Sequence, residues 1–221
     1  MLSTSTSHIR HGFRKNRLLQ GLVLWYVAVW LVTAVRPLDR SDWVLENLLV
    51  AAMVVVLVGT YRVFPLSDLS YVIITLFMTL HAVGAHYTYS EVPFGYWMRD
   101  HLGFARNPFD RVVHFSFGLL MAYPIREVFL RVANARGFWA YYLPLDVTLA
   151  FSALYEIMEM VIATLVAPGT GDAWLGTQGD IWDAQKDMGL AALGALICMI
   201  ITATVRTMRA QKPVLLAGRD A

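Results

Sequence analysis

Six long apolar segments, separated by short polar stretches, dominate the chain. They cover residues 18–35, 44–60, 69 to about 87, 110 to about 130, 142–166 and 187 to about 207. Each approaches the roughly 20 residues that an α-helix needs to cross the hydrocarbon core of a bilayer. Neither the helical nor the strand amphipathic period explains apolar runs of this length. The pattern predicts an all-α, polytopic transmembrane bundle of about six spans.

The composition agrees with a membrane protein and excludes other classes. Of the 221 residues, 57% are hydrophobic and 15% are charged, whereas about a quarter of the residues in a soluble domain are charged. The net charge is only +2 and no basic patch lies outside the two tails, so nucleic acid is not expected as a partner. The single cysteine, Cys198, lies within an apolar run and indicates neither a disulfide nor a thiolate metal cluster.

The distribution of positive charge predicts the orientation. If both tails and the second and fourth loops are inside, twelve of the 18 Lys and Arg residues are cytoplasmic: Arg10, Arg14, Lys15, Arg17, Arg62, Arg126, Arg131, Arg136, Arg206, Arg209, Lys212 and Arg219. The positive-inside rule therefore predicts that both termini are cytoplasmic. We divide the chain into a basic tail (residues 1–17), a six-helix transmembrane domain (18–207) and a C-terminal tail (208–221).

Ionisable residues gather near the predicted outer ends of four spans. They are His81 and His86 on the third, Asp110 and His114 on the fourth, Glu156 and Glu159 on the fifth, and Asp183 and Asp187 on the sixth. An ionisable side chain within a membrane helix costs roughly 2.5 to 3.5 kcal/mol on insertion scales. One shared site is therefore favoured over four separate burials. Clustered carboxylates in a low dielectric need protons or cations to neutralise them.

This cluster predicts a divalent metal site. Oxygen and imidazole ligands suit zinc, manganese, iron or magnesium, and residue pairs one turn apart on several helices build carboxylate metal sites in helical bundles. The expected ligands are His86, Asp110, His114, Asp183 and Asp187. We assign Glu156 and Glu159 to catalysis, as general base or further ligand. Substrate contacts are assigned to His81, Tyr87, Gln178, Asp180 and Gln185.

Two features of the loops and the last span add expectations. The outer segments 88–109 and 167–186 are long and rich in aromatic residues, which is typical either of an interfacial belt or of a lid over an outward-facing pocket. Small residues in the last span predict close helix packing: Gly189, Ala191, Ala192, Gly194 and Ala195.

Several stretches resemble the YjdF-like family of bacterial inner-membrane proteins. They are residues 86–89, 107–115, 155–156 and 176–187, and the resemblance covers residues 18–207. The second half is also distantly similar to the VanZ-like group, through Asp110, Arg111, His114, Phe115, Glu156, Asp183, Asp187, Gly189 and Gly194, although Glu159 stands where that group often carries glutamine. The resemblance implies a multi-pass protein of the bacterial inner (plasma) membrane and supplies no mechanism.

Three functions fit this pattern. The leading hypothesis is a metal-dependent hydrolase or transferase acting at the outer leaflet on a membrane lipid or lipid-linked envelope substrate. The same acids fit a small proton- or ion-coupled transporter, or a noncatalytic envelope factor whose polar network only holds the helices together. The residues leave open whether the protein is an enzyme, which metal and substrate it takes, and its oligomeric state.

Overall fold

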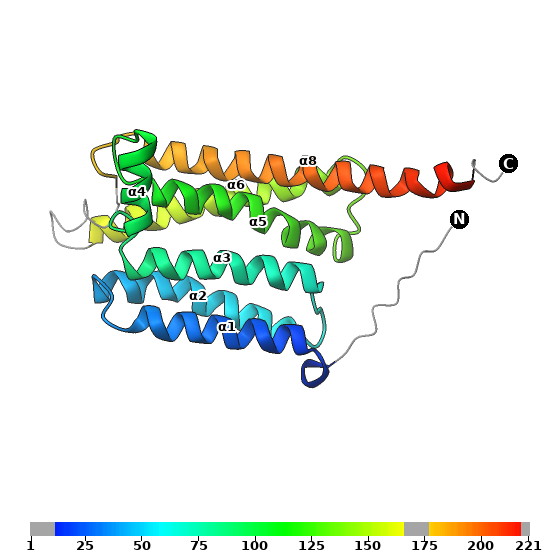
Figure 1. The fold of residues 1–221 in the computed structure, drawn as a ribbon, viewed down its shortest axis with the longest axis horizontal. Helices are drawn as coiled ribbons and strands as arrows, with labels where there is room; N and C mark the ends of the chain where they lie inside the picture. The colour runs from blue at the N-terminus through cyan, green and yellow to red at the C-terminus, as the bar shows by residue number, and fades with distance from the viewer. Residues whose placement is uncertain (1–11, 166–176, 218–221) are drawn as a thin grey trace.

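The protein is helical throughout the residues that the structure describes. The structure is a computed structural model, and it describes residues 12–165 and 177–217. A short 3-10 helix, η1 (Phe13–Lys15), precedes the helices α1 (Arg17–Ala34), α2 (Arg40–Thr60), α3 (Asp68–His86), α4 (Pro93–Leu102), α5 (Phe109–Arg131), α6 (Trp139–Leu165) and α8 (Asp183–Ala217). The six long helices run side by side in one bundle, and α4 lies across one end of it (Figure 1).

Five of these helices are long and apolar enough to cross a membrane, namely α1, α2, α3, α6 and the part of α8 up to Gln211. The helix α5 has 23 residues and so extends about 34 Å at 1.5 Å per residue. It packs against α3, α6 and α8. Because protein surrounds α5 on several sides, it can carry polar side chains that a lipid-facing helix cannot. The predicted polytopic helical bundle is confirmed, with α5 as its polar central helix.

The bundle has two layers, formed by α1–α3 and by α5, α6 and α8, and joined by packing of α3 on α5 (Figure 1). A core cluster between the layers contains Val50, Ile74, Met78 and Met121. On the outside, large apolar side chains are open: Leu24, Val55 and Val58 are 71%, 70% and 70% exposed. A surface of this kind is stable only against lipid.

Polar caps explain where several helices begin. Asn16, Asp39 and Ser67 accept hydrogen bonds from backbone amides at the starts of α1, α2 and α3. Pro93 occupies the first turn of α4, and Gly103 ends that helix in the left-handed conformation, with φ of 75°. Figure 1 shows that α1 begins and α8 ends at the same end of the bundle. This agrees with termini on one side, while the sidedness itself stays a prediction.

The first long outer segment contains a helix that the sequence reading did not assign. The rings of Phe94 and Trp97 on α4 stack with centroids 5.6 Å apart, and both side chains are exposed. This arrangement fits the interfacial belt. The first half of the second outer segment, for which a lid was one of two expectations, lies outside the described residues.

Small residues bring α5 and α8 into backbone contact, as predicted. A Cβ added at Gly194 would lie 2.7 Å from the amide nitrogen of Leu119, and one added at Gly118 would collide with the carbonyl of Ala191. Gly189 is different, because an added Cβ there would meet nothing within 4 Å. The two helices therefore touch at the level of Gly118 and Gly194, and Gly189 faces open space beside that contact.

Candidate functional site

Asp110, His114 and Asp187 converge at the end of the bundle where α5 and α8 begin. One ligand atom from each lies within 4.8 Å of the other two. Asp110 and His114 are one turn apart on α5, and His114 Nε2 is 3.6 Å from Asp110 Oδ1. The facing helix α8 supplies Asp187, which is only 1% exposed. The structure thus brings together three of the five predicted ligands in a group that can hold a metal ion.

The helix α6 adds Glu156 to this group. Its Oε1 atom is 3.3 Å from Nε2 of His114, and Ser152, one turn earlier on α6, places its hydroxyl 3.4 Å from His114 Nδ1. Within the described part of the chain, Glu156 Oε1 and Asp187 Oδ1 are buried without a hydrogen-bond partner. A buried acceptor without a partner costs about 1 to 3 kcal/mol, more if it is charged. A cation or a proton bound to each oxygen would remove that cost.

Asp183, a predicted ligand, belongs to a different cluster. It lies outside the three-residue group and pairs with the guanidinium of Arg106, with Nη1 at 2.9 Å from Oδ2. Arg111 lies 2.5 Å from Asp180 and 3.4 Å from Asp183, and Lys186 lies 2.5 Å from Asp180. We call these five residues the rim. Its formal charge is three positive against two negative, or +1.

Asp180 stays ionised at the rim. The Lys186 ammonium, the backbone amide of Trp182 and the Arg111 guanidinium all donate to its carboxylate and lower its pKa to about 2. Its negative charge is therefore constant through the physiological pH range. The predicted substrate residue Asp180 is a fixed counterion that holds two cationic side chains together.

A second polar network lies between α2, α3 and α6. The Tyr155 hydroxyl donates to the carboxylate of Glu46, with oxygens 3.0 and 3.1 Å away. His81 Nε2 is 3.3 Å from the carbonyl oxygen of Glu46, and its Nδ1 is 2.6 Å from the Tyr89 hydroxyl. Glu159 interacts electrostatically with this network and with Asp110. The predicted residues His81 and Glu159 therefore lie outside the three-residue group.

Sequence reasoning missed Glu46, Tyr89, Tyr155 and Arg106. A signal existed for Glu46, which is a carboxylate inside the second predicted span and is 7% exposed. The two tyrosines carried no comparable signal, because aromatic residues are common at membrane interfaces.

His86 meets α1, whereas the Tyr87 ring packs against the cluster that contains Phe109 and Val113 of α5. Nδ1 of His86 is 2.8 Å from the carbonyl oxygen of Thr33 on α1, and the Tyr87 ring packs edge-on against His86, with centroids 4.5 Å apart. His86 is not part of the metal-compatible group. The sequence placed His86 at the same membrane depth as the other predicted ligands, but it could not show which neighbouring helix this face of α3 meets.

Gln178 and Gln185 have contrasting environments. Gln178 accepts from the backbone amide of Asn107 and donates to its carbonyl, each at 3.1 Å, which fixes the loop before α8 against the start of α5. Gln185 is exposed. Neither side chain has a contact that tests the predicted substrate role.

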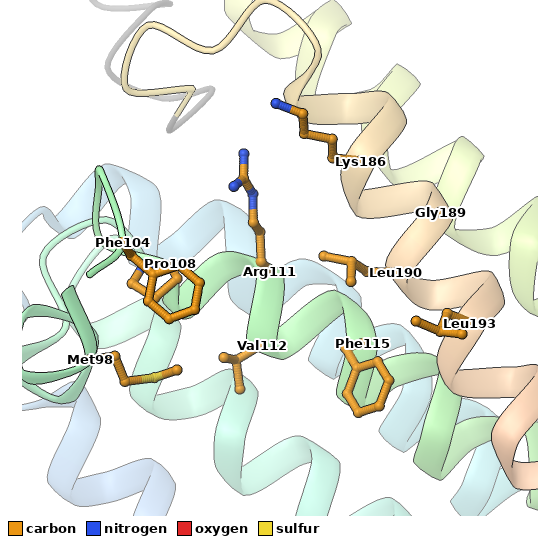
Figure 2. A pocket seen from close by; sticks show the side chains of 10 residues that line it. All are labelled: Met98, Phe104, Pro108, Arg111, Val112, Phe115, Lys186, Gly189, Leu190 and Leu193. Carbon is orange, nitrogen blue, oxygen red and sulfur yellow. The ribbon is translucent and has the colours of Figure 1, made fainter. Parts of the chain in front are cut away.

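A groove of about 610 Å³ lies beside the candidate centre, between α4, α5 and α8. Figure 2 shows its lining, which is apolar except where Arg111 and Lys186 extend from α5 and α8. The other lining residues are Met98, Phe104, Pro108, Val112, Phe115, Gly189, Leu190 and Leu193. The groove therefore combines a hydrocarbon-like wall with two cationic side chains at one place.

Comparison with known proteins identifies the family of this chain. The model of a family described as "Predicted membrane protein (DUF2238)" matches residues 18–208. The chain belongs to the DUF2238 family. It is also similar to the inner membrane protein YjdF of Escherichia coli (strain K12), with 36% identity over 205 residues that cover 92% of this chain and 98% of that protein. No solved structure matches the chain significantly.

Membership of the DUF2238 family confirms the YjdF-like resemblance and the location in the bacterial inner membrane. The VanZ-like part of the resemblance receives no support from these comparisons. The described residues contain a carboxylate and histidine cluster of the predicted kind, and neither the family description nor the relative's name refers to a metal. This DUF2238 protein is thus an integral membrane protein with a buried acidic and imidazole cluster near one end of its bundle.

Proposed function

We propose that this DUF2238 protein is a metal-dependent hydrolase or transferase that acts at the outer leaflet on a lipid or lipid-linked molecule. The observation that carries the proposal is the buried carboxylate of Asp187, which lies beside Asp110 and His114 and whose Oδ1 atom lacks a hydrogen-bond partner among the described residues. Acidic groups alone are common in proteins. A carboxylate that is 99% buried and incompletely paired needs a positive charge or a proton.

Each side chain has a role in this proposal. Asp110, His114 and Asp187 would hold a divalent cation, which would supply a Lewis acid and an activated water. Ser152 fixes the orientation of the His114 ring through Nδ1, leaving Nε2 for the centre. Glu156 lies next to Nε2, where it can accept a proton from a nucleophile bound at the centre.

The distribution of polar groups favours an enzyme over a transporter. A pathway for ions needs polar groups through the full thickness of the membrane. Ser67 and Glu127 form another polar cluster, in which Glu127 Oε1 accepts a hydrogen bond from the Ser67 amide at 2.8 Å. This cluster and the candidate centre lie toward opposite ends of α3 and α5. Between them on α3 and α5 lie three members of the hydrophobic core: Ile74, Met78 and Met121. Over the described residues, apolar packing therefore separates the two polar ends.

A noncatalytic envelope factor is the second candidate. The pair Glu46–Tyr155 joins α2 to α6, and the pair Arg106–Asp183 joins the segment before α5 to α8. Both contacts can serve architecture alone, because interhelical hydrogen bonds stabilise membrane bundles modestly. This candidate predicts no affinity for divalent metals, which makes metal binding the decisive measurement.

The experiment compares the full-length wild type with His114→Ala and a matched histidine control, His101→Ala. His101 is exposed on α4 and lies outside the three-residue group. We expect roughly one bound divalent ion per chain for wild type and His101→Ala, prepared without chelator or loaded with zinc, manganese, iron(II) or magnesium. His114→Ala should remain helical by circular dichroism and lose the ion. A wild type that neither contains metal nor gains stability from any of the four cations would refute the metal centre.

A further inference from the structure

We propose that the groove between α4, α5 and α8 binds an anionic phospholipid, with one acyl chain along α8 and the phosphate against Arg111 and Lys186. The inference rests on the proposed function in one respect, namely that the bound lipid is the substrate or its membrane-bound analogue. It goes beyond that proposal by naming the place and the charge of the lipid. The position of the groove, its charge and its depth each support this assignment.

The groove adjoins the candidate centre through the covalent chain itself. Arg111 directly follows Asp110 on α5, and Lys186 directly precedes Asp187 on α8. Consecutive Cα atoms lie about 3.8 Å apart, and consecutive residues on a helix point to different faces. The same two helix starts therefore present candidate ligands on one face and the cationic end of the groove on another. A headgroup at the groove would therefore lie on the helix faces next to those that carry the candidate ligands.

Charge selects an anionic headgroup. Asp180 neutralises only one of the two cations that touch it, since Arg111 and Lys186 both lie 2.5 Å from the same carboxylate. Asp183 is already paired with Arg106. The five rim residues together carry a formal charge of +1, so a phosphate beside Arg111 and Lys186 meets a net positive rim. Each cationic side chain near a membrane surface contributes about 1 kcal/mol to binding an anionic lipid.

The groove also has the length and wall of a chain-binding site. From Lys186 to Leu193 the helix α8 rises about 10 Å, or a third of the hydrocarbon core. Leu193 and Phe104 are exposed toward the open side, where lipid is the surrounding medium. Gly189 leaves open space in the middle of the groove, because an added Cβ would meet no atom within 4 Å.

This empty space supplies a selective test. Gly189→Leu should fill the groove without disturbing the helix contact at Gly194, and Gly59→Leu on α2 is a matched control, because its added Cβ also meets nothing within 4 Å. The full chain is placed in nanodiscs of phosphatidylglycerol and phosphatidylcholine, and the retained lipid is identified by native mass spectrometry. Wild type and Gly59→Leu should retain one phosphatidylglycerol preferentially, and Gly189→Leu should lose it.

Lys186→Gln tests the headgroup, and it should reduce the preference for phosphatidylglycerol over phosphatidylcholine about fivefold. Equal retention in Gly189→Leu and wild type, absence of a headgroup preference in wild type, or displacement by glycerol phosphate without acyl chains would each overturn the lipid site. Metal content is measured on the same samples. If the wild type binds metal but shows no lipid preference, only the assignment of the groove is refuted. If the wild type prefers phosphatidylglycerol but binds no metal, the groove assignment stands and the catalytic centre is refuted.

Discussion

Replacing Asp187 by asparagine gives opposite results with and without metal. The substitution keeps the shape of a side chain that is 1% exposed and removes its charge. Without metal, the carboxylate is buried with an unpaired oxygen, so Asp187→Asn should leave the free energy of unfolding unchanged or raise it by up to about 2 kcal/mol. With metal, the variant loses an anionic ligand, and the wild type should become the more stable protein.

The size of this reversal can be worked out. At a metal concentration 100 times Kd, binding stabilises the wild type by about 2.7 kcal/mol. Removing a residue that only hydrogen-bonds a metal ligand weakens metal binding by about 10- to 100-fold. Removing a direct ligand should therefore weaken metal binding by at least about 100-fold. The variant would then gain only about 0.4 kcal/mol at the same concentration. The metal-dependent difference of about 2.3 kcal/mol corresponds to roughly 5 to 9 °C in Tm for a chain of this size.

The assay is thermal unfolding in detergent, with and without added divalent cation, alongside metal analysis. Asp183→Asn is the control on the same helix, because it breaks the buried pair with Arg106 and should destabilise the protein under both conditions by about 3 to 5 kcal/mol. If Asp187→Asn shows the same metal-dependent shift in Tm as the wild type, Asp187 is not a ligand and the reasoning from its unpaired oxygen is refuted.

Three further predictions follow from the site. Glu156→Gln should retain metal and lose activity on a lipid substrate by roughly a hundredfold or more. Glu159→Gln should lower kcat less. If both variants are as active as the wild type, Glu156 is not the general base. Asp180→Asn should lower Tm at pH 7 and have little effect at about pH 2. The pKa of Asp180 is about 2 in the folded state and about 3.9 in the unfolded state. The ionised carboxylate therefore stabilises the fold above the unfolded pKa, and this stabilisation disappears as the pH falls through the folded pKa. Glu46→Phe should unfold the protein at lower temperature without changing its metal content, as measured on the same preparation, because Glu46 bonds Tyr155 outside the three-residue group.

Depth along a helix was readable from the sequence, and this explains why the structure brings together some of the residues that the sequence placed at one level. A carboxylate or imidazole in an apolar run has a known distance from the end of its helix, since each residue rises 1.5 Å. That reasoning placed Asp110, His114 and Asp187 at one level, where the structure brings them together. It placed His86 and Asp183 at the same level as well, and the structure directs them to Thr33 and to Arg106.

The sequence by itself determined the helical class, the spans of α1, α2, α3, α6 and α8, and the level at which acids and histidines are concentrated, because the hydrophobic length of a span and the rise of a helix are properties of single segments. Only the tertiary structure decided which helix faces meet. The rotation of α3 directs His86 to α1, and the backbone contact of α5 with α8 near Gly118 and Gly194 sets Asp187 against His114. These outcomes depend on contacts between segments distant in sequence. The small residues of the last span predict that it packs closely, but no local pattern specifies which helix face it meets.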